Sequence, residues 1–153
     1  MSIVVVRPED GEQTGAAGIP IRIIEDGSHT QHRVALIEAV VQPAPAGPPQ
    51  HTHNQHDEIF IVTNGRLRFT SGDEVVDVDT GSCVTVPAGV PHTFSNPFSE
   101  PARFIATMTP DLYVEYFRDL AQLPVGENGL PTTVDIGRTM ARYDTVVVPP
   151  TRS

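Results

Sequence analysis

The sequence predicts an all-β fold, a sandwich or barrel, for most of its length. Its 15 prolines and 12 glycines divide the 153 residues into short pieces, and these pieces are rich in Val, Ile, Thr and Phe. Apolar and polar residues alternate within them, which places the apolar side chains on one face of a strand. Strands are therefore expected over residues 21–24, 33–41, 58–63, 66–70, 74–78, 84–86, 92–95 and 103–108.

One turn between these strands has a strong hairpin signal. Asn64-Gly65 separates the strands expected over residues 58–63 and 66–70. Both residues suit a type I′ turn, which needs positive φ at its two central positions. The sequence therefore predicts that these two strands fold back on each other.

After residue 108 the apolar residues change to helical spacing. Thr109 can cap a helix, Pro110 suits its first position, and apolar side chains then recur at intervals of three and four residues. We expect one helix over residues 111–122 and a second over residues 134–143.

Length and composition indicate one globular domain. A chain of 153 residues fits a single core, and a content of 39% hydrophobic and 19% charged residues argues against disorder. We expect a barrel over residues 1–109 and a helical tail over residues 110–153. The tail should pack on the same domain, because two short helices cannot bury a core alone.

Charge and cysteine content exclude several classes of partner. The formal net charge of −9, with no run of Lys or Arg, argues against binding to nucleic acid. No window has the length and hydropathy of a transmembrane span, and the start of the chain lacks the features of a signal peptide. Cys83 is the only cysteine, so no internal disulfide can form. We expect a cytoplasmic protein with no membrane partner.

Three histidines and a glutamate have a spacing that favours a shared target. His51 and His53 are two residues apart, which on a strand places both on one face. Glu58 begins the next alternating run. His92 follows a turn rich in proline and glycine that delivers it to the start of another strand. An HxH pair alone is often two surface residues, but the third histidine has a structural reason to arrive beside it.

The segments around these histidines resemble the two sequence motifs of the cupin superfamily. Motif one has three residues instead of five before its first histidine, and its positions are Gly47, His51, His53, Glu58 and Gly65. Motif two matches at every interval, and its positions are Gly81, Pro87, Gly89, His92 and Asn96. The resemblance implies a jelly-roll, double-stranded β-barrel with one or two C-terminal helices.

The resemblance also implies one divalent transition metal inside the barrel, held by His51, His53, Glu58 and His92. Such donors suit Fe, Mn, Ni, Cu, Co or Zn and leave one or two positions open. Alternatively, Glu58 is a catalytic base on a bound substrate. By strand alternation Gln55 shares the ligand face, whereas His56 does not and is expected to be solvated. His29 and His32 are expected at the surface.

The chain resembles a narrower group as well, the single-domain cupins similar to quercetin 2,3-dioxygenase, over residues 48–60, 103–110, 116–121 and 140–150. This resemblance implies a dioxygenase in which the metal makes an enolic or aromatic small molecule electron-rich enough to react with O2. Glu58 would take the substrate proton. An apolar wall around the substrate would consist of Phe60, Phe69, Phe94 and Met108.

Two other functions use the same residues. The metal could act without O2, in an isomerase, a lyase or a polyketide cyclase, because one fold supports many reactions. The other possibility is a cupin that binds a small molecule without catalytic activity. The intact set of four proposed metal ligands disfavours this function. Measurement of oxygen uptake distinguishes the dioxygenase from the isomerase, lyase or cyclase.

The strand that contains Glu58 has a second apolar face, formed by Ile59 and Ile61. An apolar face must be covered by a sheet, a helix or another chain. Together with the apolar Val4, Val5 and Val6, this face predicts a homodimer. The alternative is that the C-terminal helices cover it.

Overall fold

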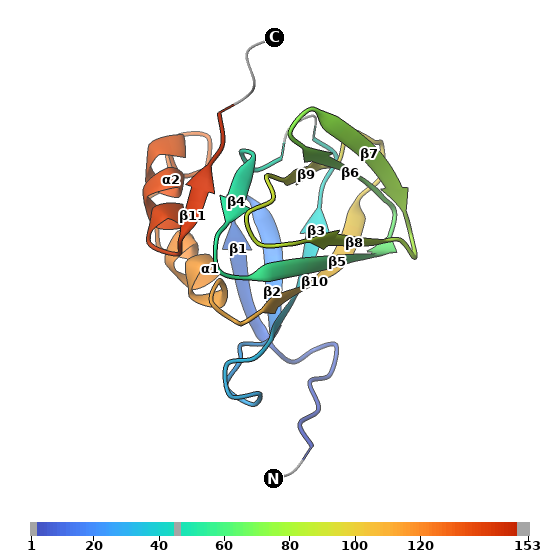
Figure 1. The fold of residues 1–153 in the computed structure, drawn as a ribbon, viewed down its shortest axis with the longest axis vertical. Helices are drawn as coiled ribbons and strands as arrows, with labels where there is room; N and C mark the ends of the chain where they lie inside the picture. Colours follow the sequence, from blue (N-terminus) through green and yellow to red (C-terminus); the bar gives the residue numbers. More distant parts are fainter. Residues whose placement is uncertain (1–2, 45–46, 150–153) are drawn as a thin grey trace.

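The computed structural model describes residues 3–44 and 47–149 of the chain. These residues contain eleven strands and two helices (Figure 1). The elements in chain order are β1 (Glu12–Ala16), β2 (Ile19–Glu25), β3 (Ala35–Val41), β4 (His51–His53), β5 (Asp57–Asn64), β6 (Arg66–Ser71), β7 (Glu74–Asp79), β8 (Cys83–Val86), β9 (Thr93–Ser95), β10 (Ala102–Thr109), α1 (Val114–Ala121), α2 (Thr133–Ala141) and β11 (Thr145–Val147).

The strands form three antiparallel sheets. The largest has the order β1-β2-β3-β10-β5-β8, a second has the order β7-β6-β9, and β11 pairs with β4 in a third. The first two sheets face each other across a shared core, because the Phe60 ring of β5 lies 5.2 Å from that of Phe69 on β6. The Phe104 ring of β10 likewise lies 5.0 Å from that of Phe94 on β9. This is the all-β jelly-roll barrel with two C-terminal helices that the sequence predicts.

Strict alternation builds this core. In β10 the residues that point inward are buried and their neighbours are more exposed, and β3 alternates in the same way. The pairing of β10 with β3 places Phe104 beside Ala39 and Ala106 beside Ile37. Full burial of each large apolar side chain stabilises the fold by about 2 kcal/mol. The barrel wall therefore follows directly from the period-two pattern.

The predicted hairpin at Asn64-Gly65 is wrong. β5 pairs with β10 and β8, whereas β6 pairs with β7 and β9. The chain thus crosses from one sheet to the other at this turn. Gly65 has a φ of 74°, and a Cβ there would lie 2.7 Å from the Pro101 carbonyl oxygen. Glycine is required at this corner by its φ and by the close approach of another backbone segment, not by a type I′ turn.

The two helices follow the barrel. α1 begins at Val114, three residues later than predicted, and Thr109, the predicted cap, pairs with Asp57 in the sheet instead. α2 agrees closely with the prediction, and the Thr132 hydroxyl caps it by accepting from the backbone N–H of Asp135 at 3.1 Å. Residues 150–153 of the predicted tail lie outside the described residues. No helix in the described part of the chain is long and apolar enough to cross a membrane.

The outer face of β5 is not covered by the helices. Ile61 is 42% exposed and Ile59 is partly buried. α1 packs against β1 and α2 against β11, on the opposite side of the barrel from β8 in Figure 1. The alternative in which the C-terminal helices cover this face is therefore wrong for Ile61, and the homodimer stays a prediction.

Candidate metal centre

The short strand β4 places His51 and His53 on one face. Both side chains are buried, whereas Thr52 between them is partly exposed. β11 fixes this strand from one side, because Thr145 pairs with His53 and Val147 with His51. β11 lies about 90 residues further along the chain, where no strand was expected from the sequence.

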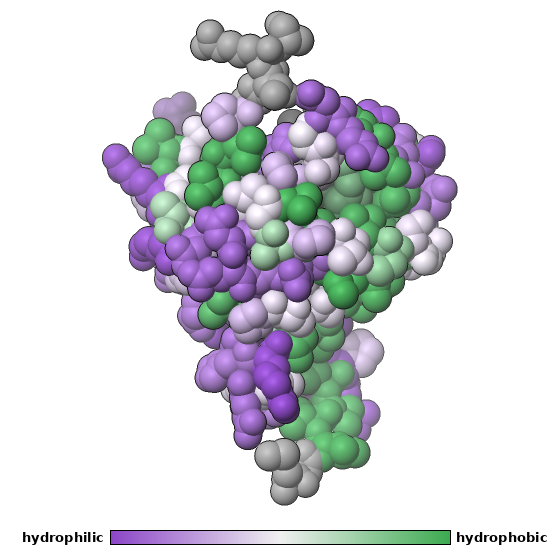
Figure 2. Space-filling view, in the orientation of Figure 1, coloured by the Kyte–Doolittle hydropathy of each residue, from purple (hydrophilic) through white to green (hydrophobic). Residues whose placement is uncertain are grey.

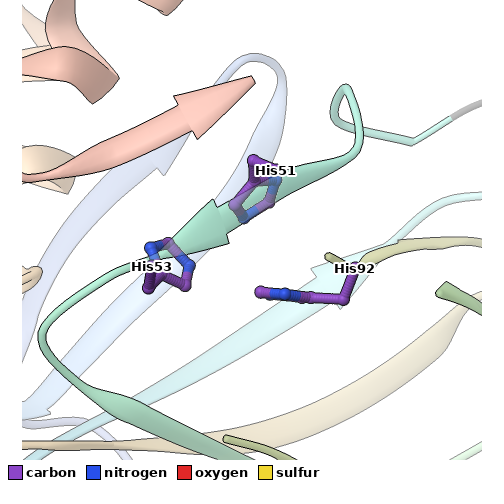
Figure 3. A group of neighbouring side chains, drawn as sticks. All are labelled: His51, His53 and His92. Atoms are coloured by element: carbon purple, nitrogen blue, oxygen red, sulfur yellow. The ribbon is translucent and has the colours of Figure 1, made fainter. Parts of the chain in front are cut away.

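His92 reaches the same place through main-chain hydrogen bonds. The His51 N–H donates to the His92 carbonyl at 3.0 Å, and the His92 N–H donates to the His51 carbonyl at 2.9 Å. The N–H of Gly89 also donates to the His53 carbonyl at 2.7 Å. The turn rich in proline and glycine therefore delivers His92 as predicted. Figure 3 shows the three imidazole rings directed toward one another from β4 and from the segment before β9.

Gly47 holds the approach to β4 against β9. A Cβ at this position would lie 1.6 Å from the carbonyl oxygen of Phe94, so no other residue fits without a shift of the backbone. The Thr93 hydroxyl donates to the Pro48 carbonyl at 2.6 Å in the same contact. Gly47 is therefore a structural glycine that lets the loop before His51 lie on the neighbouring strand.

Each of the three imidazoles holds its Nδ1 atom in a contact outside the cluster and directs its Nε2 atom inward. The Nδ1 atoms of His51 and His92 lie 2.7 Å and 3.1 Å from the carbonyl oxygens of Pro49 and Val90. The Nδ1 atom of His53 lies 2.7 Å from a threonine hydroxyl. Backbone carbonyls only accept, so Nδ1 of His51 and His92 must carry a proton. This pattern leaves Nε2 as the ligand atom, because a metal-binding histidine typically donates its other ring N–H to a neighbouring acceptor.

Glu58 completes the cluster from β5. Its Oε2 atom lies 3.0 Å from His92 Nε2 and 3.4 Å from His53 Nε2. Burial raises the pKa of Glu58, but the contacts with His53, His56 and His92 outweigh it and hold that pKa well below its ordinary value. The carboxylate is therefore negatively charged at neutral pH, in the middle of four imidazole rings.

The imidazoles of His51 and His53 are held neutral. Burial, with a smaller contribution from the neighbouring His92 and His53, lowers the pKa of His51 to about 4. Burial likewise lowers the pKa of His53. A metal binds only the deprotonated nitrogen, so these low pKa values preserve the ligand form of the ring at neutral pH.

The predicted position of His56 is wrong, because this side chain is buried and not solvated. It is 3% exposed, and its ring stacks on that of His53 with the centroids 4.3 Å apart. Gln55 is exposed and donates to Asp144, so it does not share the ligand face. Strand alternation failed here because residues 54–56 form the bend between β4 and β5, and a bend does not keep a period of two.

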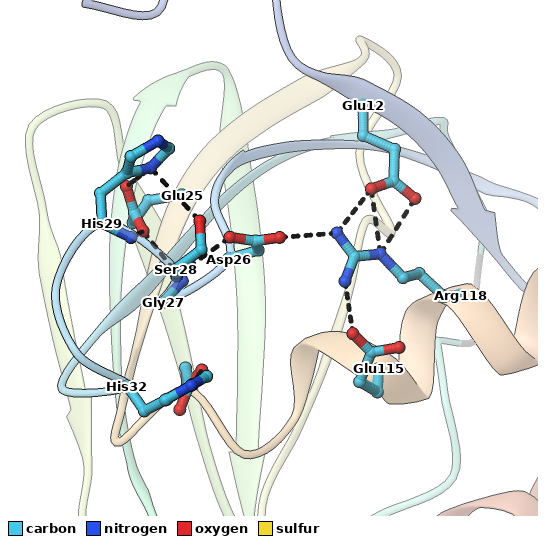
Figure 4. A network of polar contacts seen from close by, with 10 residues as sticks. Glu12, Glu25, Asp26, Gly27, Ser28, His29, His32, Glu115 and Arg118 are labelled. Carbon is cyan, nitrogen blue, oxygen red and sulfur yellow. Dashed lines mark hydrogen bonds and ion pairs between the residues drawn. The ribbon is translucent and has the colours of Figure 1, made fainter. Parts of the chain in front are cut away.

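His29 and His32 are at the surface, as expected, with side chains 51% and 79% exposed. Figure 4 shows His29 beside Glu25, in the loop after β2. His32 Nδ1 lies 2.7 Å from Asp111 Oδ2, which fixes the segment before α1.

A transition metal fits the donors that the structure brings together. The Nε2 atoms of His53 and His56 are buried and have no hydrogen-bond partner among the described residues. The nitrogens of His51, His53 and His92 lie within 4.8 Å of one another. Nitrogen donors around one ion at about 2.1 Å lie roughly 3 to 4 Å apart. Small movements of these side chains would therefore close the set on one cation.

A cavity of about 80 Å³ opens beside this cluster. It has room for several water molecules, since one needs roughly 10 to 15 Å³. Of the predicted wall, Phe60 and Phe94 line the cavity, whereas Phe69 and Met108 do not. Both of these are buried in the core instead, at 4% and 0% exposure. Alternation correctly predicted that all four side chains point inward, but it does not specify their depth along the barrel.

The helical tail supplies the part of the cavity wall that the sequence did not predict. These residues come from α1, α2 and the position before α1: Tyr113, Tyr116, Phe117, Leu120, Ile136 and Met140. The helical spacing that predicted α1 also predicts one apolar face on it. That spacing could not show whether this face covers the closed core or the cavity.

Tyr113 is the most unusual of these residues. Its ring centroid lies 4.3 Å from that of His53, and its buried hydroxyl has no hydrogen-bond partner within the described part of the chain. Burial, followed by the proximity of Tyr116 and Glu58, raises the pKa of Tyr113 well above its ordinary value. The hydroxyl is thus a neutral donor beside the cluster.

A polar network holds α1 over the cavity. Arg118 on α1 pairs with Glu12 of β1 at 2.7 Å and with Asp26, in the turn after β2, at 2.9 Å (Figure 4). It also pairs with Glu115 on its own helix. Contacts with Ser28 and then with Arg118 lower the pKa of Asp26. This network joins the helix that carries the aromatic wall to the first two strands.

The barrel has the fold of the cupins. Residues 37–108 match the family model described as a cupin domain, and solved structures of cupins superpose on the barrel. The match and the superpositions support a place for this chain in the cupin superfamily.

The curated relatives of this chain include a transcriptional regulator. The HTH-type transcriptional regulator PuuR of Escherichia coli is 26% identical over 110 residues, which cover 72% of this chain and 58% of PuuR. The chain thus spans less than two thirds of this curated relative.

Two solved structures share the fold. A predicted oxalate decarboxylase from Thermotoga maritima superposes with a TM-score of 0.62 at 16% identity, over 70% of this chain and 99% of that one. The polyketide cyclase RemF from Streptomyces resistomycificus gives 0.61 at 22% identity, over 71% and 80%. At these identities the likeness shows the fold alone.

Proposed function

We propose that this protein is a metal-dependent dioxygenase that acts on a compact enolic or aromatic small molecule. The observation that carries the proposal is the position of His51, His53 and His92, with their Nε2 atoms inward, at the wall of a cavity lined mainly by apolar and aromatic side chains. Convergent polar groups in an apolar pocket are typical of small-molecule sites.

The donor set supports this class of chemistry. When bound, a divalent metal would supply Lewis-acid and redox chemistry toward an oxygen atom of the substrate. Glu58 is negatively charged beside the three histidines, so its carboxylate can accept the proton that an enol must lose. Burial of these groups removes them from bulk solvent, which strengthens each of these electrostatic contacts.

The cavity wall supports an aromatic or enolic substrate. Phe60, Phe94 and Phe104 form one side of it, and their rings lie 5.0–6.1 Å from one another. Aromatic side chains at these distances favour edge and offset contacts with a further ring. The unpartnered hydroxyl of Tyr113, which also lines the cavity, can donate to a substrate oxygen.

Oxygen consumption tests the proposal. Protein loaded in turn with Fe(II), Mn(II), Ni(II), Cu(II) or Co(II) would be mixed with a panel of enolic and catechol compounds in an oxygen electrode. We expect one equivalent of O2 consumed per substrate, with both atoms of ¹⁸O2 recovered in the product, and no uptake by His51→Ala. Turnover that proceeds at full rate under strict anoxia contradicts a dioxygenase.

The same site could act without O2, as an isomerase, a lyase or a cyclase. The observation that favours this candidate is a negatively charged carboxylate beside the histidine cluster, which can move a proton between carbon atoms without an oxidant. A fold shared with a polyketide cyclase is compatible with it. The anaerobic arm of the same experiment detects it as product formation without O2.

A third candidate is a ligand-binding protein without activity. The similarity to a transcriptional regulator over 72% of the chain favours it. Saturable binding of a compound by calorimetry, with that compound recovered unchanged from metal-loaded protein, would support this function over both enzymes.

A further inference from the structure

His56 is an unexplained buried histidine beside the proposed metal ligands. It is 3% exposed, and its Nε2 atom is buried and meets no hydrogen-bond partner among the described residues. That atom lies 3.8 Å from Glu58 Oε1, so it is directed toward the cluster and away from solvent. Buried polar atoms in folded proteins are almost always satisfied. A bound species is therefore expected to satisfy this one.

His56 belongs to a second set of potential donors. The ligand atoms of His53, His56 and Glu58 lie within 4.8 Å of one another, as do those of His51, His53 and His92. All of these side chains are buried. Two nitrogens and one carboxylate oxygen are a familiar ligand combination for divalent transition metals.

The two sets share His53. Its Nδ1 atom lies 2.7 Å from the Thr145 hydroxyl, which itself donates to the Tyr143 carbonyl at 3.1 Å. The hydroxyl therefore accepts from Nδ1, and Nε2 has the only lone pair that His53 can offer. One lone pair binds one cation, so the two sets cannot each hold an ion at the same time. The geometry fits one metal with an extra donor and not a dinuclear centre.

We propose that His56 is a metal ligand of this centre and, with His53 and Glu58, forms a donor set that overlaps the one formed by His51, His53 and His92. The inference rests on the metal of the proposed function, but it is independent of O2 and of any substrate. It adds a fourth imidazole to the centre, drawn from the bend between β4 and β5. The ring of His53, stacked on that of His56, keeps this donor in place.

The wild-type protein can be tested directly. Zinc(II) would be added to protein labelled with ¹⁵N in its histidine rings, and the Nε2 chemical shifts would be followed by NMR. We expect one zinc per chain and shifts typical of coordination at Nε2 of His56 as well as of His53. A zinc-saturated protein in which His53 responds and the His56 nitrogens do not overturns the proposal.

Variants provide a second test that reads the metal itself. His56→Phe keeps a ring to stack on His53 but removes the nitrogen, and His56→Gln serves in its place if the phenylalanine variant does not fold. We expect a loss of at least tenfold in Co(II) affinity and a shift of the visible Co(II) bands. Unchanged affinity and bands in a folded variant overturn the proposal.

Two controls separate the possible failures. His29→Ala removes an exposed histidine from the surface group of Glu25, Asp26 and His29, and it should leave affinity and stoichiometry unchanged. His51→Ala should remove the metal. If that variant loses Co(II) while both His56 variants keep it, the His56 assignment fails and the metal centre stands. If wild-type protein binds no Co(II) or Zn(II), the metal centre and the His56 assignment fail together.

Discussion

The Nδ1 atom of His53 on β4 lies 2.7 Å from the Oγ1 atom of Thr145 on β11. The hydroxyl donates to the Tyr143 carbonyl, so it accepts from His53 and fixes the ring with Nε2 directed inward. Both residues are at least 98% buried. A contact between residues 92 positions apart thus determines which nitrogen of a proposed ligand is available.

Replacement of Thr145 by valine tests this contact. The substitution keeps the shape of the side chain but leaves the Nδ1 proton of His53 without an acceptor, and loss of such a partner typically costs about 10- to 100-fold in metal affinity. We expect a loss in this range for Thr145→Val, measured by competition with a chromogenic chelator. Thr145→Ser retains the hydroxyl and should bind as the wild type does. Equal affinity in the valine and serine variants would mean that the contact does not orient the ring.

The Glu58→Gln variant tests whether Glu58 is a catalytic base or a metal ligand. The amide has the size of the carboxylate but accepts no proton, and general-base catalysis contributes about 10²- to 10⁴-fold. We expect a loss of activity in this range while metal occupancy, measured by elemental analysis, stays near one per chain because the imidazole ligands remain. Loss of the metal together with activity would identify Glu58 as mainly a ligand.

Tyr113→Phe tests whether the unpartnered hydroxyl serves a bound substrate. Removal of a buried hydroxyl that has no partner should stabilise the free protein by about 1 kcal/mol, which thermal unfolding would detect as a higher Tm. The same variant should have a lower kcat/KM, because it loses the donor to the substrate. Tyr116→Phe, on the adjacent stacked ring, is the matched control. A lower Tm with unchanged kcat/KM would assign the hydroxyl a structural role only.

The predicted homodimer is tested through the outer face of β5. Ile61 is 42% exposed, and the register places it beside Ile105 on β10 and Cys83 on β8, so the centre of this face is apolar. Burial of a new charge there is unfavourable, and Ile61→Glu should convert a dimer to a monomer in sedimentation velocity. Val134→Glu changes an exposed side chain of α2 (58% exposed) and should not. A wild-type protein that sediments as a monomer at working concentration removes the dimer prediction.

The local sequence pattern was sufficient to predict the barrel and the proximity of His51, His53, Glu58 and His92. Alternation placed His51 and His53 on one face, and turn chemistry brought His92 to them. What the sequence could not specify depends on long-range pairing. Thr145 lies on a three-residue strand that forms only against β4, and the turn at Asn64-Gly65 resembles a hairpin although its strands enter different sheets.

His56 and the cavity wall show a second limit of what the sequence pattern can predict. A period-two rule applies to strands, so it gave the wrong side for His56 in the bend between β4 and β5. Alternation also separates inside from outside without giving depth, which is why Phe60 lines the cavity and Phe69 does not. These details depend on how the sheets and helices close around the site.

The central claim is that His51, His53 and His92 converge on one divalent metal. The most direct measurement is elemental analysis and Co(II) titration of protein purified without a chelating tag, for the wild type and for His51→Ala and His92→Ala. We predict one metal per chain in the wild type and none in either variant, with both variants folded by circular dichroism. Full occupancy in either folded variant would contradict the claim.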